Sequence, residues 1–190
     1  YSNKTRGKDR TLTNRACVAF QSVRFHQDNR QRGLHRFTLF EEGFIGANPT
    51  LKFVDSNIFL HAFLKPRRKL TQKELKIKEE AQAIVKKIEN GEEVAMSTTH
   101  LSEVVNVIET SLSLEKSLGF LAWVVSKDNI EVYSVGLSHY ETCLPLAKEN
   151  KISANDALAY LSMKSYRLKE IYSFDKHFDQ LKDVVRLPKT

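Results

Sequence analysis

The decisive stretch of this sequence is Leu51-Lys52-Phe53-Val54-Asp55-Ser56-Asn57-Ile58-Phe59-Leu60. A short apolar run ends in an acid, and a Ser and an Asn separate it from a second apolar run. The pattern predicts a buried strand that ends at Asp55, followed at once by a helix that Ser56 or Asn57 helps to cap. Ligands of parallel α/β sheets bind at this strand edge. Asp55 is therefore a helix cap unless further acids reach the same edge, in which case it belongs to a metal site.

Strand-like and helix-like segments alternate from Leu51 to the end of the chain. This alternation is typical of βαβ units with right-handed crossovers, which build a parallel sheet covered on both faces. The predicted fold class is α/β, a single three-layer α/β/α domain over residues 51–190 around a central parallel five-stranded sheet. We expect strands at residues 51–54, 94–97, 130–135, 171–174 and 184–187, with helices at residues 56–64, 71–90, 114–126, 138–150, 153–168 and 176–181.

Several of the expected helices carry local signals. Thr71 with Glu74 three residues later is a capping box, and Gly91 ends the helix that it opens. Thr98 or Thr99 is expected to cap a further helix directly after the second strand. The expected inner face of the helix at residues 114–126 consists of Leu118, Leu121, Ala122 and Val125.

The composition is that of a globular domain with a modest basic excess. The net charge is +7, but residues 1–50 hold nine Lys and Arg against four Asp and Glu, so that segment alone accounts for +5. The bulk charge of the patterned part is therefore weak support for a polyanion partner. Cys17 and Cys143 are the only cysteines, without zinc-type spacing, which favours a reducing cytoplasm. The longest apolar run, residues 118–125, is too short to span a bilayer, so no membrane association is expected.

Residues 1–50 lack any sustained helical or strand period. We interpret them as a poorly patterned basic N-terminal extension that is either disordered or not part of the fold, such as translated leader sequence. A basic arm that grips RNA is the competing interpretation.

Four carboxylates stand at the ends of predicted strands or in the helices that follow, namely Asp55, Glu103, Asp156 and Asp175. Each has an ordinary explanation as a cap or a solvated surface residue. Together they are expected at one sheet edge, where carboxylates about 4 Å apart repel by roughly 4 kcal/mol per pair at an effective dielectric constant near 20. A cation relieves this repulsion, and hard oxygen ligands select Mg²⁺ or Mn²⁺. Phosphodiester hydrolysis is the chemistry natural to such a site.

The other polar residues near these positions leave alternatives open. His100 and His177 lie close in sequence to Glu103 and Asp175, but we favour solvation or capping for both, since no zinc-type pair accompanies them. The basic loop after the first helix either contacts RNA phosphates or is simply an exposed charged loop. Its residues are Arg67, Arg68 and Lys69.

Four motifs in order resemble those of PIN-domain proteins, most of all the VapC-type toxins of prokaryotic toxin–antitoxin pairs. They are residues 53–57, 101–105, 155–157 and 173–178. The resemblance covers residues 51–190 and implies a PIN-like fold. It also implies a Mg²⁺- or Mn²⁺-dependent endoribonuclease in which Asp55, Glu103, Asp156 and Asp175 form the catalytic and metal-binding cluster. The resemblance further assigns supporting positions to Asn57 and Ser173, and Asp179 could be an outer helper.

The resemblance to toxins implies partners as well as chemistry. The substrate is expected to be RNA, and the protein is expected to form a homodimer that a small antitoxin silences. Two alternatives remain open at this point, a non-catalytic PIN-like module that binds RNA or protein, and a ribosomal-RNA processing nuclease of the same superfamily.

Overall fold

The computed structural model describes residues 51–66 and 68–189. The predictions for residues 1–50 and for Arg67 therefore lie outside the described residues. Five parallel strands form one sheet, as the sequence predicted, and the structure gives their order as β3-β2-β1-β4-β5. The strands are β1 (Lys52–Val54), β2 (Val94–Ser97), β3 (Ile130–Tyr133), β4 (Glu170–Tyr172) and β5 (Val185–Leu187).

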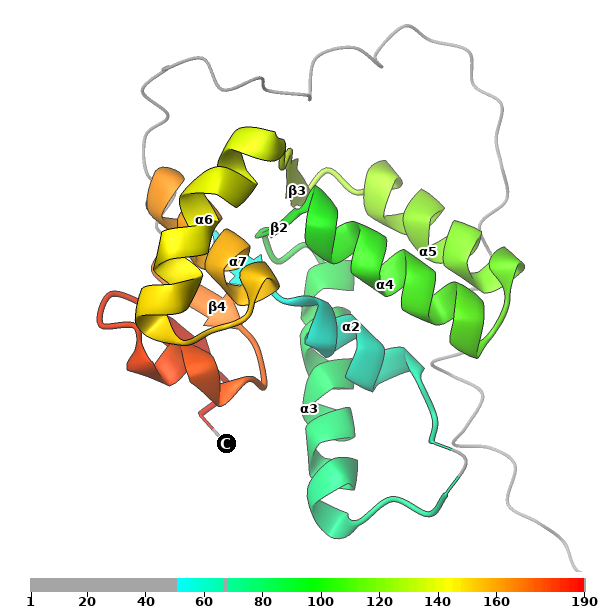
Figure 1. Cartoon of the computed structure of the whole chain (residues 1–190). Helices are drawn as coiled ribbons and strands as arrows, with labels where there is room; N and C mark the ends of the chain where they lie inside the picture. Colours follow the sequence, from blue (N-terminus) through cyan, green and yellow to red (C-terminus); the bar gives the residue numbers. More distant parts are fainter. Residues whose placement is uncertain (1–50, 67, 190) are drawn as a thin grey trace, which may run out of the picture. The chain divides into compact units, whose positions relative to one another are not determined.

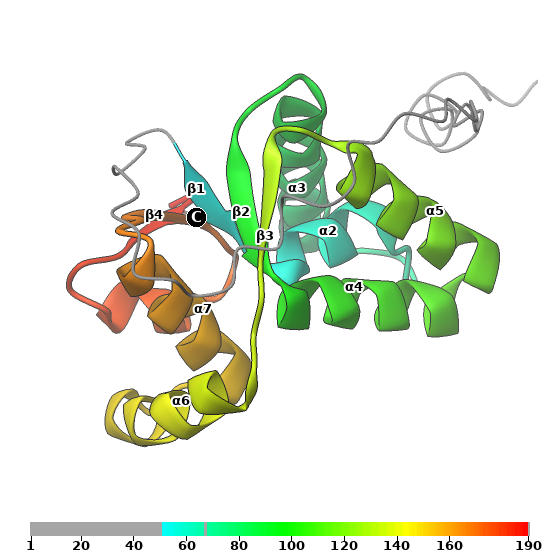
Figure 2. The same cartoon turned by 90° about the horizontal axis from the view of Figure 1, so that it is seen from above.

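Helices cover both faces of the sheet, as Figure 2 shows for α3 and α5 on one side and α7 on the other. The central strand β1 is accordingly apolar on both faces, and Phe53 and Val54 are fully buried. Figure 1 shows α4 and α5 running side by side, with α6 packed against α7. The helices are α2 (Ser56–Phe63), α3 (Gln72–Glu89), α4 (Thr98–Ser111), α5 (Leu114–Ser126), α6 (Leu137–Asn150) and α7 (Ala154–Ser165), followed by the 3₁₀ helix η1 (Lys176–Gln180).

The helix starts confirm most of the local signals. Thr71 and Glu74 form the predicted capping box of α3, and Gly91 after that helix has a φ of +103°. The predicted cap of α4 is wrong, because Ser97 takes this place and its Oγ accepts a hydrogen bond from the His100 backbone. Ser97 is still extended, whereas Thr98 is already helical, so the strand passes into the helix without a loop.

The predicted inner face of α5 is wrong in part. Leu118 is 52% exposed and Val125 is 70% exposed, whereas Phe120 and Val124 are buried. The ring of Phe120 packs against that of Phe59 in α2, with ring centroids 5.2 Å apart. Apolar residues lie nearly all round this helix, so its periodicity could not select the face that packs. Burying the large aromatic ring decides the orientation.

Among the described residues, no helix is long and apolar enough to cross a membrane. The carboxyl ends of β1, β2 and β4 lead directly into α2, α4 and the turn before η1. These junctions bring residues from distant parts of the chain to one edge of the sheet.

Candidate functional site

Asp55 lies at the carboxyl end of β1, where its backbone N–H still donates to the Tyr172 carbonyl of β4 at 3.0 Å. Its side chain is only 6% exposed. One carboxylate oxygen, Oδ2, accepts hydrogen bonds from Asn57 Nδ2 at 2.6 Å and Ser173 Oγ at 2.7 Å. Asp55 occupies the N-cap position of α2, yet its side chain makes no capping hydrogen bond. The carboxylate therefore serves this edge of the sheet and not the helix.

The environment of Asp55 disfavours its negative charge. Burial raises the pKa of Asp55 to about 6, and the nearby charge of Asp156 adds to the rise, although the hydrogen bond from Ser173 opposes it. At neutral pH, ionised Asp55 is therefore a buried anion that a bound cation would stabilise.

Glu103 reaches the same edge from α4. Its Oε2 accepts hydrogen bonds from Ser56 Oγ at 2.9 Å and from Asn155 Nδ2 at 3.2 Å. Ser56 Oγ also lies 3.2 Å from Asp55 Oδ1. A hydroxyl has a single proton, so it can satisfy only one of these two carboxylates at a time. The repulsion between Asp55 and Glu103 is therefore not cancelled by this shared hydroxyl group.

Asp156 combines both of the roles considered from the sequence. It completes a capping box of α7, because its Oδ2 accepts from Ser153 Oγ at 2.7 Å and from the Ser153 backbone at 3.2 Å. It also contributes to the raised pKa of Asp55 through its charge, which places the two acids within electrostatic reach. Capping and membership of the acidic cluster are thus compatible, since a carboxylate has two oxygens.

Asp175 joins the cluster from the turn after β4. Its Oδ1 accepts from the His177 backbone at 2.8 Å, and the His177 ring nitrogen Nδ1 lies 3.0 Å from the same oxygen. One possible ligand atom each from Asp156, Asp175 and His177 lie within 4.8 Å of one another. The structure therefore brings Asp175 beside Asp156, and it adds a histidine that the sequence did not favour as a site residue.

Asn57 and Ser173 occupy the centre of the hydrogen-bond network. Asn57 Nδ2 donates to Ser173 Oγ at 3.0 Å, and its Oδ1 accepts from the Phe174 backbone at 3.2 Å. Ser173 Oγ in turn accepts from the Asp175 backbone at 3.0 Å. Through these contacts Ser173 connects Asp55 to Asp175, so the two supporting positions hold the ends of β1 and β4 together.

The structure places Asp179 on a different partner. Its two oxygens accept from Nε and Nη2 of Arg186, both at 2.9 Å. Buried Arg186 also donates through Nη1 to the Ser173 carbonyl at 3.3 Å. Asp179 therefore contacts none of the four acids directly, and any support that it gives them passes through Arg186.

The basic loop is partly occupied by internal contacts. Arg68 makes a two-pronged salt bridge to Glu74, the residue that completes the α3 capping box. Lys69 is exposed, and Arg67 lies outside the described residues. A phosphate that binds Arg68 would therefore compete with Glu74, which makes this arginine a weaker RNA contact than the sequence indicates.

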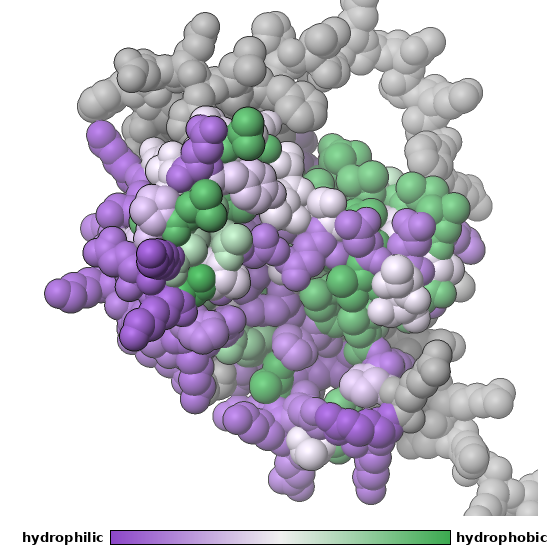
Figure 3. Space-filling model, in the orientation of Figure 1, coloured by the Kyte–Doolittle hydropathy of each residue, from purple (hydrophilic) through white to green (hydrophobic). Residues whose placement is uncertain are grey.

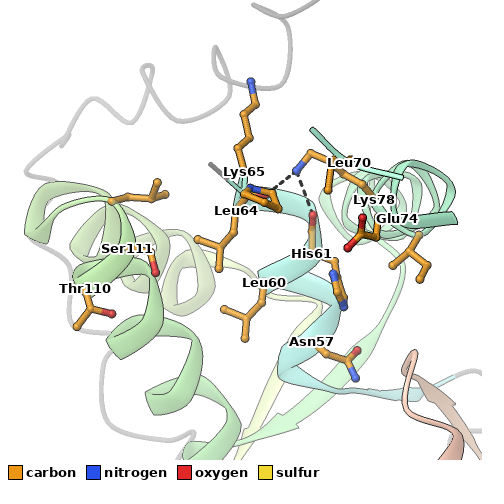
Figure 4. A pocket seen from close by; sticks show the side chains of 13 residues that line it. Asn57, Leu60, His61, Leu64, Lys65, Leu70, Glu74, Lys78, Thr110 and Ser111 are labelled. Atoms are coloured by element: carbon orange, nitrogen blue, oxygen red, sulfur yellow. Dashed lines mark hydrogen bonds between the residues drawn. The ribbon is translucent and has the colours of Figure 1, made fainter. Parts of the chain in front are cut away.

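A cavity of about 680 Å³ opens beside Asn57, between α2, α3 and the end of α4. Figure 4 shows His61 and Lys78 on its wall, with Lys78 pointing to the end of α2. Lys78 Nζ donates to the carbonyls of His61 and Leu64 at 3.1 and 2.8 Å. This lysine therefore stabilises the last turn of α2, whose final carbonyls lack helical partners.

The sequence interpretation missed the roles of Ser56 and Asn155. Both stand beside a predicted acid in the sequence, and this adjacency is the signal that could have identified them. The interpretation of His100 as a solvated residue is wrong, because its side chain is buried and Ser97 Oγ lies 2.7 Å from its Nδ1. Burial lowers the pKa of His100 to about 4, so this histidine is neutral at physiological pH.

The donor set of this edge fits a divalent cation. In residues 51–66 and 68–189, the hydrogen bonds to the four acids come from Ser and Asn side chains and backbone N–H groups, the His177 ring lies close to Asp175, and no Lys or Arg is among their partners. Clustered carboxylates without a cationic side chain repel one another unless an ion binds. Asp55, Glu103, Asp156 and Asp175 are the residues that could hold it.

Comparison with known proteins agrees with this architecture. The chain is similar to VapC20 of Mycobacterium tuberculosis, at 17% identity and a TM-score of 0.54 over 70% of this chain and 96% of that one. It is also similar to PAE2754 from Pyrobaculum aerophilum, at 16% identity and a TM-score of 0.50 over 74% of this chain and 92% of that one. No curated protein matches.

The family model described as PIN domain matches residues 52–184. This span begins at β1 and contains all four acids at the carboxyl edge of the sheet. The PIN-like fold expected from the four motifs is therefore confirmed, and the chain belongs to the PIN-domain family.

Proposed function

We propose that this protein is a metal-dependent endoribonuclease that hydrolyses RNA phosphodiester bonds with Mg²⁺ or Mn²⁺. The supporting observation is the set of four acids at one sheet edge, with no Lys or Arg bonded to them among the described residues. A binding or structural protein gains nothing from such unrelieved repulsion. A metal nuclease needs such a cluster of negative charge, because it concentrates divalent cations at the scissile phosphate.

The protein residues have separable roles in this proposal. Asp55, Glu103, Asp156 and Asp175 would hold the cation, which when bound would orient a water molecule, lower its pKa and neutralise charge on the phosphate. Asn57 and Ser173 fix the orientation of the Asp55 carboxylate through hydrogen bonds of 2.6 and 2.7 Å. Ser56 and Asn155 do the same for Glu103.

The test measures cleavage of varied RNAs with Mn²⁺ and with Mg²⁺, comparing wild type with Asp55→Asn. We expect cleavage by the wild type, and a loss of at least about a hundredfold in the variant, since even partners outside the ligand shell of metal sites change activity 10–100-fold. The matched control is Asp128→Asn, in the exposed turn between α5 and β3 at the opposite end of the strands, and it should cleave normally. Equal activity in wild type and Asp55→Asn would contradict the proposal.

We further propose that the nuclease acts as the toxin of a toxin–antitoxin pair. The solved structure of VapC20 is described as that of a sarcin-ricin loop cleaving toxin, and this chain shares its fold. Expression of the wild type should arrest growth, expression of Asp55→Asn should not, and a small antitoxin encoded next to the gene should restore growth. Growth that is unaffected by an active enzyme would favour the ribosomal-RNA processing nuclease instead.

A homodimer is part of the same proposal. Figure 3 shows apolar side chains gathered over the region of α4 and α5, and the exposed apolar residues of α5 include Leu118 and Val125. Large exposed apolar residues on one helix are typical of protein interfaces. Light scattering of the wild type should give the mass of a dimer, and Leu118→Glu should shift it toward the monomer. A wild-type monomer would contradict this part alone.

The non-catalytic module remains the second candidate. It requires that wild type and Asp55→Asn bind RNA or protein equally and that neither cleaves RNA with either metal. The raised pKa of Asp55, about 6, weighs against it. Keeping an ionised carboxylate buried lowers the stability of the protein, and a binding module has no reason to maintain such a residue.

A further inference from the structure

His177 lies at the acidic cluster although it is not one of the four acids. It is the second residue of η1, and its backbone N–H donates to Asp175 Oδ1 at 2.8 Å. That contact holds the start of η1 against the Asp175 carboxylate. The His177 ring follows and brings Nδ1 to 3.0 Å from the same oxygen. The side chain is 60% exposed, so the ring can turn toward the solvent-accessible side of the cluster.

The spacing of this group suits one ion. Ligand atoms of Asp156, Asp175 and His177 all lie within 4.8 Å of one another. An octahedral ion with ligands at about 2.1 Å separates adjacent ligand atoms by about 3.0 Å and opposite ones by about 4.2 Å. Small side-chain rotations therefore suffice to bring one atom from each residue onto a common ion.

We propose that His177 supplies a nitrogen ligand to the cation held by Asp156 and Asp175, and that this nitrogen makes the centre prefer Mn²⁺ and Co²⁺ to Mg²⁺. The inference rests on the proposed function for the presence of a divalent cation. Mg²⁺ takes oxygen ligands and retains its waters, whereas imidazole suits transition-metal ions. A site with two carboxylates and one imidazole therefore binds transition ions more tightly than a site built from carboxylates alone.

A competing explanation gives His177 only a supporting role. A histidine that donates a hydrogen bond to Asp175 would orient this carboxylate without touching the ion. Both explanations predict that removing His177 weakens metal binding. Only direct coordination predicts a nitrogen signal from the metal and a change in metal preference.

The experiment uses the full chain with metal alone and no RNA. Pulsed electron paramagnetic resonance of the Mn²⁺-loaded protein should show coupling to an imidazole nitrogen, and His177→Gln should lose it. Calorimetry should show Mn²⁺ and Co²⁺ affinity falling at least about tenfold in that variant, while Mg²⁺ affinity changes little. His177→Asp, which offers an oxygen ligand in place of the nitrogen, should restore Mn²⁺ binding without the nitrogen signal.

The matched control is His139→Gln in the first turn of α6. His139 Nδ1 accepts from the Gly136 backbone at 3.0 Å, and Gln is a natural residue at this helix position, so the cap survives. This variant should keep the nitrogen signal and all affinities.

Two outcomes overturn the inference. One is Mn²⁺ binding to the wild type without imidazole coupling, and the other is His177→Gln with unchanged metal preference. If RNA is still cleaved in those cases, the proposed function stands and only the role of His177 fails. If the wild type binds no divalent cation at all, the proposed function fails with it.

Discussion

The two ends of strand β1 carry opposite electrostatic arrangements. At the amino end, Lys52 Nζ lies 3.1 Å from Glu92 Oε1 and 3.6 Å from Glu170 Oε2, and the Tyr172 hydroxyl donates to Glu92 at 2.7 Å. At the carboxyl end, Asp55 receives only Ser and Asn hydrogen bonds. Among the described residues, the same strand thus has one end where a lysine partly compensates two carboxylates and one end where Asp55 has no Lys or Arg partner. The first end is structural, and the second is suited to bind a cation.

The largest expected effect is on the pH dependence of the stability of the metal-free protein. Because the folded-state pKa of Asp55, about 6, lies above the ordinary aspartate value of 3.8, the folded protein binds more protons than the unfolded chain between these two values, and its stability falls as pH rises through this window. The shift corresponds to a loss of up to about 3 kcal/mol at neutral pH. Asp55→Asn should therefore be more stable than wild type at pH 7.5 with a chelator present, by urea denaturation, and should lose this advantage near pH 4.

The substitution is well matched to the network. An Asn oxygen in the place of Asp55 Oδ2 can still accept from Asn57 and Ser173, while its amide can donate to Ser56 Oγ. A variant that is less stable than wild type at both pH values would show that the charge of Asp55 is compensated after all.

The next effect is stabilisation by metal. A ligand at a hundredfold excess over its Kd adds about 2.7 kcal/mol to the free energy of unfolding when only the folded state binds it. Mn²⁺ should therefore raise the melting temperature of the wild type and leave Asp55→Asn unchanged. Lys52→Met, at the other end of the strand, should respond to Mn²⁺ like the wild type. A response in Asp55→Asn equal to that of the wild type would break the contrast between the two ends.

Ser173→Ala should have a smaller effect at the carboxyl end. The Ser173 hydroxyl donates to Asp55 and accepts from Asn57 and the Asp175 backbone, so its loss leaves buried donors unsatisfied at a cost of about 1–3 kcal/mol. Because this hydrogen bond lowers the pKa of Asp55, the variant should raise that pKa further. An NMR titration of the Asp55 carboxyl carbon in metal-free protein measures the shift. An unchanged or lower pKa would contradict the assigned contact.

The smallest effect is expected at the amino end. Lys52→Met leaves Glu92 and Glu170 without their shared cation, but both groups are partly exposed, so the cost should be about 1 kcal/mol. Urea denaturation measures it, and 0.5 M salt should reduce the difference because it screens exposed charges. RNA cleavage should stay at the wild-type level. A large loss of cleavage would mean that the amino end takes part in the site.

Local sequence patterns predicted the positions of the acids well. Asp55 and Asp175 end apolar runs that become β1 and β4, and Asp156 completes a capping box that is visible in the sequence as Ser153 followed three residues later by an acid. These are short-range relations between neighbours in the chain, which depend little on the rest of the fold. Their convergence followed from the parallel sheet, because all strand ends of one kind share an edge.

Contacts between distant residues could not be predicted in the same way. Ser56 bonds to Glu103 across 47 residues, and Ser173 bonds to Asp55 across 118. Asp179 was considered as an outer helper of the acids but pairs with Arg186, because the turn of η1 directs it toward β5. The exposed face of α5 was assigned incorrectly for a similar reason, since apolar residues surround the helix and only packing on Phe59 selects a side.

The sequence by itself determined the strand that ends in Asp55, the order of strands and helices, and the acids at their junctions, because periodicity and capping act between near neighbours. Only the tertiary structure decided which acids have a cationic partner. Lys52 has two carboxylate partners, whereas the acids at the other end of the strand have neutral donors and one histidine. Electrostatic compensation depends on distances and burial across the whole fold, and no local pattern encodes them.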